Sequence, residues 1–187
     1  MRPTLRKRLG GLIATVLLAG AGLAATTTGA NAQPASAPAV TPFAGVFHPL
    51  KNVGNAKCLQ PAGASTVETV EIVQQPCDGS IAQGWQHVGV GGNHYMFLNQ
   101  LSGYCFNAFD GATDGARLLQ LTCKRISNEE FNTGAALPNV VKIESRVGFR
   151  DTNFCVDVPG GAATNGLAMQ IWNCNGSLAQ RWIVGFD

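Results

Sequence analysis

The sequence carries little charge and no long helical pattern. Charged residues make up 13% of the 187 residues, and none of the three His residues belongs to a motif linking it to a nucleophilic Ser or Cys. Outside the N-terminus, no stretch keeps apolar residues at i, i+3, i+4 and i+7 over about ten residues. Phosphate-binding and zinc signatures are also missing. We therefore expect no helical fold, and we predict no catalytic residues, no metal ligands and no cofactor.

The N-terminus has the pattern of an export signal. Four basic residues lie within the first eight, residues 9–25 are uncharged, small and apolar, and Ala30-Asn31-Ala32 has the small-x-small pattern of a cleavage site. A membrane anchor is the alternative, but it needs ~20 apolar residues, and this stretch reaches that length only if its many Gly and Ala are counted. We predict a signal peptide over residues 1–32 and a secreted, extracellular protein.

The chain that follows the leader is slightly acidic. Nine Lys and Arg stand against eleven Asp and Glu in it, a net charge of −2. Such a balance, without a basic stripe, argues against nucleic acid as a partner. No later hydrophobic stretch could span a bilayer, so membrane insertion is not expected. Residues 33–43 are rich in Pro and Ala and predict a flexible lead-in, and the remaining residues 44–187 are enough for one domain.

All six cysteines follow the leader, and they recur regularly. An even number in an exported protein predicts disulfides, although six cysteines allow 15 pairings. The cysteines form three pairs with separations of 19, 18 and 19, and the pairs begin 47 and 50 residues apart. Metal binding is the alternative, but there is no C-x-x-C and no His at ligand spacing. We predict the disulfides Cys58–Cys77, Cys105–Cys123 and Cys155–Cys174.

The cysteine pairs belong to a unit used three times. Each unit ends on a related motif: Gln83-Gly84-Trp85, Glu129-Glu130-Phe131 or Gln180-Arg181-Trp182. Short β-branched and aromatic runs separated by Gly, Asn and Asp clusters predict strands. Repeats that cannot bury their apolar faces alone pack against one another. The sequence therefore predicts an all-β closed barrel of three lobes, with repeats at about 44–90, 91–136 and 137–187.

The third unit carries the most informative motifs. Cys155-Val156-Asp157-Val158, Gln170-Ile171-Trp172-Asn173-Cys174 and the final Gln180-Arg181-Trp182 resemble those of the ricin B-chain-like lectin family. The resemblance covers residues 44–187. It implies a β-trefoil, with about four strands in each pseudo-threefold repeat, and it implies carbohydrate binding.

The same resemblance implies a sugar site in the third repeat. The family uses the Asp of Cys-x-Asp to accept from sugar hydroxyls, which assigns that role to Asp157. The aromatic of Gln-x-aromatic-x-Cys stacks under the sugar face, which assigns that role to Trp172, with Gln170 as a further polar contact. Asn175 is expected to be an extra donor, whereas Ala179 stands where the family has Asn. Galactose- or xylan-type glycans are the ligands that the family implies.

The first two repeats lack this set of residues. In the first, Gln60 and Gln75 replace the Asp and the aromatic; in the second, Asn107 and Leu121 do so. Neither repeat provides a ring for a sugar face, so we expect no standard site in either. We expect a monomer with a single site, which gives no gain from multivalency.

The terminal motif is expected to be structural. Large apolar residues fill the pseudo-threefold axis, one from each repeat: Trp85, Phe131 and Trp182. Gln83 and Gln180 are expected to hydrogen-bond backbone in the turn before them. Glu129 replaces Gln in the second repeat and has no amide to donate, so we expect that lobe to be less regular.

The sequence thus predicts a secreted, lectin-like protein that is not an enzyme. The acidic pairs Glu68 with Glu71 and Glu129 with Glu130 each lie within one lobe, whereas a glycosidase needs carboxylates that face each other across a cleft. The alternative is a protein-binding or inhibitor-type trefoil whose sugar site is a relic. Loss of Asp157 and Trp172 together would abolish the activity of a lectin and leave that of the alternative intact.

Overall fold

The computed structural model describes residues 46–137 and 139–185, so the predicted signal peptide (1–32) and lead-in (33–43) lie outside the described residues. No helix among the described residues is long and apolar enough to cross a membrane. The strands are β1 (His48–Pro49), β2 (Lys51–Asn52), β3 (Cys58–Pro61), β4 (Val70–Gln75), β5 (Gly84–Gly91), β6 (His94–Asn99), β7 (Cys105–Ala108), β8 (Ala116–Leu121), β9 (Phe131–Asn132), β10 (Ala135–Leu137), β11 (Val140–Val141), β12 (Glu144–Val147), β13 (Arg150–Asp157), β14 (Gln170–Asn173) and β15 (Trp182–Ile183). The 3₁₀ turns are η1 (Ala62–Ala64), η2 (Ile81–Gln83), η3 (Ser127–Glu129), η4 (Pro159–Gly161) and η5 (Leu178–Gln180).

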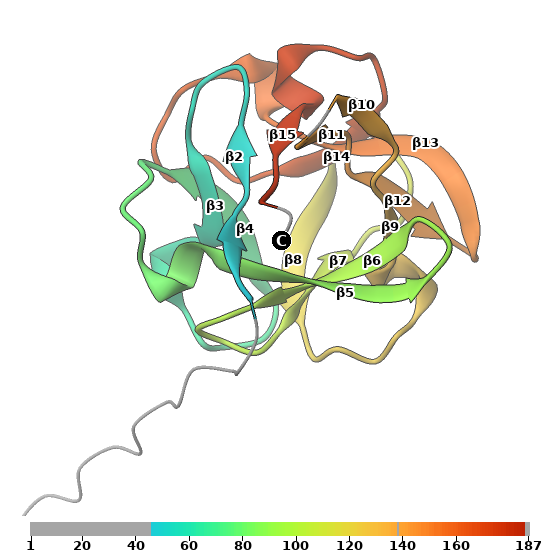
Figure 1. The fold of residues 1–187 in the computed structure, drawn as a ribbon, viewed down its shortest axis with the longest axis horizontal. Coiled ribbons are helices and arrows are strands. Elements are labelled where there is room, and N and C mark those ends of the chain that lie inside the picture. Colours follow the sequence, from blue (N-terminus) through green and yellow to red (C-terminus); the bar gives the residue numbers. More distant parts are fainter. Residues whose placement is uncertain (1–45, 138, 186–187) are drawn as a thin grey trace, which may run out of the picture. The chain divides into compact units, whose positions relative to one another are not determined.

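Antiparallel strands close into a barrel (Figure 1). β1 pairs with β5, β5 with β6, β6 with β9, and β9 with β12. β11, which leads into β12, pairs with β15, and β15 pairs with β2. Only Leu50 separates β1 from β2, so the ladder returns to the stretch of chain where it began. The strands of the described residues therefore form a closed ring.

Three hairpins, one from each repeat, cover one end of this barrel. They are β3–β4, β7–β8 and β13–β14. β8 pairs with both β4 and β14, and a bridge between Val73 and Ala168 joins the first and third hairpins. A barrel with three such hairpins is a β-trefoil, so the predicted fold is confirmed.

The aromatic residues of the terminal motif lie in the core. Trp85, Phe131 and Trp182 are all 0% exposed. The indole N–H of Trp85 donates to the carbonyl of Leu59 (2.8 Å), and that of Trp182 donates to the carbonyl of Val156 (3.1 Å). Each indole thus buries its ring while satisfying its one polar atom, as a core Trp must.

The three predicted disulfides are all present. Their Cα–Cα separations are 5.0, 5.2 and 5.1 Å, within the usual range for a disulfide. Each bridge ties the first strand of a hairpin to the segment that follows the second. Closing a loop of this length contributes about 3 kcal/mol by restricting the unfolded chain.

The residue that opens each terminal motif holds the turn before it. The side-chain oxygen of Gln83 accepts from the N–H of Asp78 (3.0 Å), and that of Gln180 accepts from the N–H of Asn175 (2.8 Å). The two amides donate to the carbonyls of Pro76 and Asn173.

Glu129 holds the corresponding turn of the second repeat. Its carboxylate accepts from the N–H of Lys124 (2.8 Å), five residues earlier as in the other repeats. The amide of Asn107 donates to its other oxygen (3.5 Å), whereas in the first repeat Gln83 donates to Gln60 (3.0 Å). In this repeat the amide therefore belongs to Asn107 and the acceptor to the terminal motif. We expected Glu129 to make this lobe less regular, but the turn before it keeps the hydrogen bond seen in the other repeats.

Candidate functional site

A pocket of about 460 Å³ opens on the third repeat. The four residues that the sequence analysis assigned to sugar binding all line it: Asp157, Gln170, Trp172 and Asn175. The remaining wall consists of Val158, Gly160, Gly161, Ser177 and Ala179. Side chains from β13, β14 and the segment after β14 are thereby brought to one place.

Strand register explains how two of these side chains come to face the pocket. Asp157 lies opposite Gln170 in the β13–β14 hairpin, and Cys155 lies opposite Trp172. Ile171 between them is 0% exposed and packs in the core. Because side chains alternate along a strand, Gln170 and Trp172 project to the other face. Trp172 is 38% exposed there, which leaves its ring open to a ligand.

Asp157 is the charged residue of the pocket, and it is only 5% exposed. The amide of Gln170 donates to its carboxylate (2.8 Å). Burial raises the pKa of Asp157, hydrogen bonds from Gln170 and Gln180 act in the opposite direction, and the charge of Asp114 adds to the rise. A buried, poorly hydrated carboxylate in a fixed orientation is a strong acceptor for a hydroxyl that enters the pocket.

A turn that the sequence analysis did not single out forms one side of the pocket. Gly160 and Gly161 of η4 have φ angles of 60° and 64°, in the left-handed region that glycine adopts without strain. A Cβ built on either would meet nothing within 4 Å, so conformation rather than space calls for glycine. The signal was present in Pro159-Gly160-Gly161, a turn pattern directly after Cys-x-Asp-Val.

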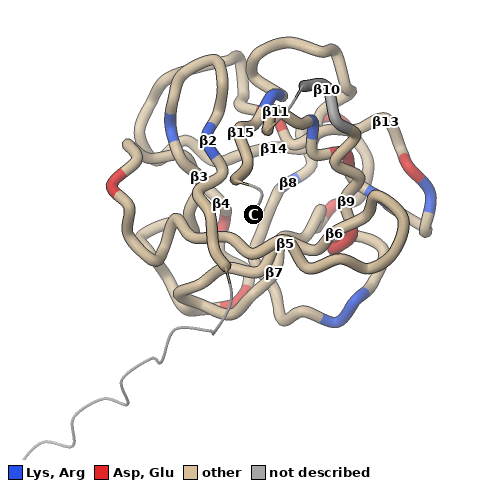
Figure 2. Tube along the Cα trace, viewed as in Figure 1, with Lys and Arg blue, Asp and Glu red and all other residues tan. Residues whose placement is uncertain are grey.

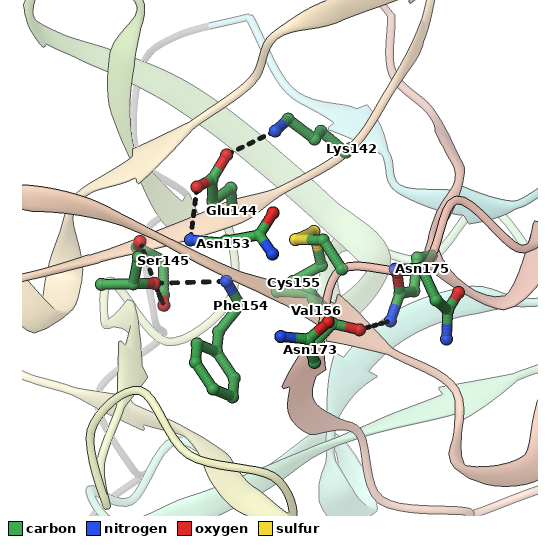
Figure 3. The surroundings of a disulfide bond; sticks show 12 residues. Lys142, Glu144, Ser145, Asn153, Phe154, Cys155, Val156, Asn173 and Asn175 are labelled. Atoms are coloured by element: carbon green, nitrogen blue, oxygen red, sulfur yellow. Dashed lines mark hydrogen bonds and ion pairs between the residues drawn. A yellow bond between two sulfur atoms is a disulfide. The ribbon is translucent and has the colours of Figure 1, made fainter.

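Another part of the wall is the segment that follows the third disulfide, and Figure 3 shows Asn175 at the start of this segment. The side-chain oxygen of Asn175 accepts from the N–H of Ser177 (2.9 Å), which leaves its amide as a donor. Ser177 is exposed and was not predicted, although its hydroxyl adds a second polar group. Ala179 presents only a methyl group where the family's Asn was expected.

An asparagine from the first repeat fixes this segment. The amide of Asn52 donates to the carbonyls of Leu178, Ala179 and Arg181, at 3.2, 3.1 and 3.2 Å. Asn99 makes the equivalent contacts to η2, at the carbonyls of Ala82 (2.9 Å) and Gly84 (3.3 Å). Sequence reasoning missed both, although each Asn stands six residues before the first Cys of its repeat.

The other two repeats do not assemble this set of groups. Gln75 lies opposite Cys58 and Leu121 lies opposite Cys105, so each takes the place of Trp172 without providing a ring. Gln60 and Asn107 are buried and bonded to the terminal motif. Among the described residues, no group of His, Cys, Asp or Glu is arranged to hold a metal ion.

Comparison with protein families identifies this architecture. The ricin-type beta-trefoil lectin domain matches residues 46–182. The chain belongs to this family. Its members share the trefoil and its three repeats, which agrees with the pairing described above. No curated protein matches the sequence significantly.

Solved structures of the same fold resemble the chain at low sequence identity. ThreeFoil, a designed threefold-symmetric protein, matches with a TM-score of 0.70 and 20% identity over 75% of this chain and 99% of its own. The exo-β-1,3-galactanase 1,3Gal43A from Clostridium thermocellum gives 0.69 and 26% over 76% of this chain but 30% of its own. A Macrolepiota procera ricin B-like lectin, in complex with lactose, gives 0.61 and 22% over 79% and 99%.

Proposed function

We propose that this protein is a secreted lectin that binds a glycan through its third repeat. Membership of the lectin family supports carbohydrate binding in general. The observation that carries the assignment to the third repeat is the convergence of Asp157, Gln170, Trp172 and Asn175 on one open pocket. The first two repeats have neither the carboxylate nor the ring.

Each group in the pocket matches a feature of a sugar. The exposed ring of Trp172 offers an apolar face to the C–H patch of a pyranose. Asp157 accepts from hydroxyls, Gln170 keeps its carboxylate in place, and Asn175 donates. Galactose- or xylan-type glycans are the proposed ligands; the Macrolepiota lectin was solved with lactose, which is consistent with the former.

We further propose that the chain acts by binding alone, as an extracellular monomer. The galactanase resembles it over 30% of the enzyme's length, so that likeness supports a binding module. The three disulfides suit an oxidising compartment outside the cell.

The test is binding of residues 33–187 to a panel of glycans and insoluble polysaccharides. Trp172→Ala and Asp157→Ala are expected to abolish binding, with folding checked by thermal unfolding. Gln75→Ala and Leu121→Ala change the corresponding position in the other repeats, and both are expected to bind like wild type. Binding that is indifferent to the first two changes would overturn the third-repeat site and turn the search to a protein partner.

A further inference from the structure

A second cavity, of about 320 Å³, adjoins the third-repeat pocket that contains Asp157 and Trp172, which is called the sugar pocket below. Alternate residues of the segment 174–181 line the two cavities, so this segment forms the wall between them. Asn175, Ser177 and Ala179 face the sugar pocket. The second cavity is lined by the Cys155–Cys174 disulfide, Gly176 and Gln180, and by two cations, Lys142 and Arg181.

The first repeat contains the same groove without the cations. That groove is also about 320 Å³, and Cys77, Gly79 and Gln83 line it in the places of Cys174, Gly176 and Gln180. Pro49 stands in it where the third repeat has Lys142, and Gly84 where it has Arg181. The corresponding residues of the second repeat are Met96 and Glu130. The groove therefore occurs in the first repeat without a positive charge, so the fold does not require the cations.

The two cations are also placed unfavourably with respect to each other. Val141 pairs with Trp182 where β11 ends and β15 begins, so Lys142 and Arg181 lie next to each other just beyond the paired ends of these strands. Like charges held close together at the ends of neighbouring strands repel each other. Lys51 lies on the other side of β15, opposite Ile183, and Lys and Arg positions gather around β2, β11 and β15 (Figure 2).

Of the two cations, only Lys142 has a carboxylate partner among the residues that the structure describes. Lys142 pairs with Glu144 (2.5 Å), whose other oxygen accepts from the N–H of Asn153 (2.6 Å) (Figure 3). The Nε of Arg181 donates to the carbonyl of Gly176 (3.2 Å), which fixes the guanidinium at the cavity. Within the described residues, Arg181 forms no ion pair, and its terminal nitrogens remain as donors.

We propose that this cavity is an anion subsite and that the glycan is acidic. Arg181 would bind a carboxylate or sulfate on a sugar next to the one that stacks on Trp172, and Lys142, paired with Glu144, lines the same cavity. A guanidinium suits either anion, because its planar array of donors matches two oxygens at once. The inference rests on the proposed sugar site, since the two cavities share one wall.

The test compares matched pairs of ligands that differ only in the acidic group. One pair is a xylo-oligosaccharide with and without a glucuronic acid branch, and the other is a galacto-oligosaccharide with and without a sulfate ester. Wild type is expected to bind the acidic member of at least one pair about five- to tenfold more tightly at low salt, with a preference that declines as salt is added. The pair that shows this preference identifies the anion.

Arg181→Gln is expected to remove the preference and leave neutral-ligand affinity unchanged. Gln keeps an amide that can replace the Nε donor to Gly176. Lys51→Gln removes the same charge outside the cavity and is the matched control, expected to keep the preference. Equal affinity of wild type for both members of each pair, or equal loss in both variants, would overturn the anion subsite.

Trp172→Ala separates this proposal from the one on which it rests. If the sugar site is real, Trp172→Ala loses the neutral ligands. Failure of wild type to bind any neutral ligand would overturn the sugar site. In that case, acidic-ligand binding that depends on Arg181 would support the anion subsite alone, and its absence would overturn both proposals.

Discussion

The second and third repeats each place an acid beside an amide at the same position of the fold, but in opposite order. In each, the second residue after the first Cys lies near the residue that opens the terminal motif. In the third repeat the acid Asp157 lies near the amide of Gln180, which acts to lower its pKa, and in the second the amide of Asn107 donates to the acid Glu129. The fold needs a donor and an acceptor at this contact, in either order. The proposed sugar site needs the acid on the pocket side, and among the described residues the third repeat has that order.

The largest expected effect comes from breaking this complementarity. Asn107→Asp would place two carboxylates in contact, because Glu129 is 0% exposed and remains in place. An uncompensated buried charge costs about 3–5 kcal/mol of unfolding free energy. Denaturant unfolding of the variant is the measurement.

Glu129→Gln should rescue that variant by reproducing the order of the third repeat. Alone, Glu129→Gln is expected to have a small effect, because the Asn107 amide can rotate to present its oxygen. A double-mutant cycle would then show strong favourable coupling between the two changes. A double variant no more stable than Asn107→Asp would mean that the two positions are not one interchangeable pair.

Asp157→Asn tests the same position in the third repeat, where we expect glycan affinity to fall without a loss of folding stability. The Asn oxygen can still accept from Gln170, but a charge-assisted contact to the sugar is lost. Affinity for the glycan is expected to fall by about 1.5–3 kcal/mol. Isothermal titration beside thermal unfolding at neutral pH separates the two effects.

The direction of the stability change follows from the raised pKa of Asp157. The folded protein holds this proton more tightly than the unfolded chain does, so the group stabilises the fold below its ordinary pKa. That contribution is lost as pH rises through the folded pKa. At neutral pH the variant should therefore be at least as stable as wild type. Wild-type affinity for the glycan should fall in acid because Asp157 becomes protonated, and the fall should begin at a pH above the ordinary Asp pKa of 3.8. A clear loss of stability in the variant would contradict this account.

A smaller effect is expected from changing Asn52 or Asn99, the asparagines that hydrogen-bond to the turns η5 and η2. Asn52→Ala and Asn99→Ala each remove hydrogen bonds to backbone carbonyls, at a cost of about 1–3 kcal/mol in unfolding free energy. Of the two, Asn52 is the one that holds η5, which forms part of the wall of the proposed sugar pocket, so only Asn52→Ala should also weaken glycan binding. Equal losses of affinity would show that the pocket responds to general destabilisation rather than to this contact.

Patterns of period and spacing made most of the fold predictable. Cysteine spacing predicted the bridges, and the terminal motif predicted three lobes around a barrel. Asp157 and Trp172 were assigned because their motifs resemble those of the family, and the alternation of side chains along a strand explains how the two reach one pocket.

Contacts between repeats were not predictable in this way. The bonds of Asn52 to η5 span more than 120 residues, and the wall formed by Ser177 depends on them. The reversal at Asn107 and Glu129 was missed for a related reason. Each residue looks like a departure when compared with its counterparts singly, and only their contact shows that the two departures compensate.

The smallest expected effect tests whether the glycan reaches from the third repeat to the second. Arg117 of β8 lies opposite Gln170 of β14, one strand away from the sugar pocket. Its guanidinium already pairs with Asp110 (2.8 Å) and lies over the ring of Phe109, and the side chain is 52% exposed. Exposed pairs of this kind contribute little, so Arg117→Ala should change glycan affinity by less than about twofold. A larger loss, measured beside the Leu121→Ala control on the same strand, would show that the glycan extends across β14. The second repeat, which has no standard site of its own, would then contribute to the site of the third.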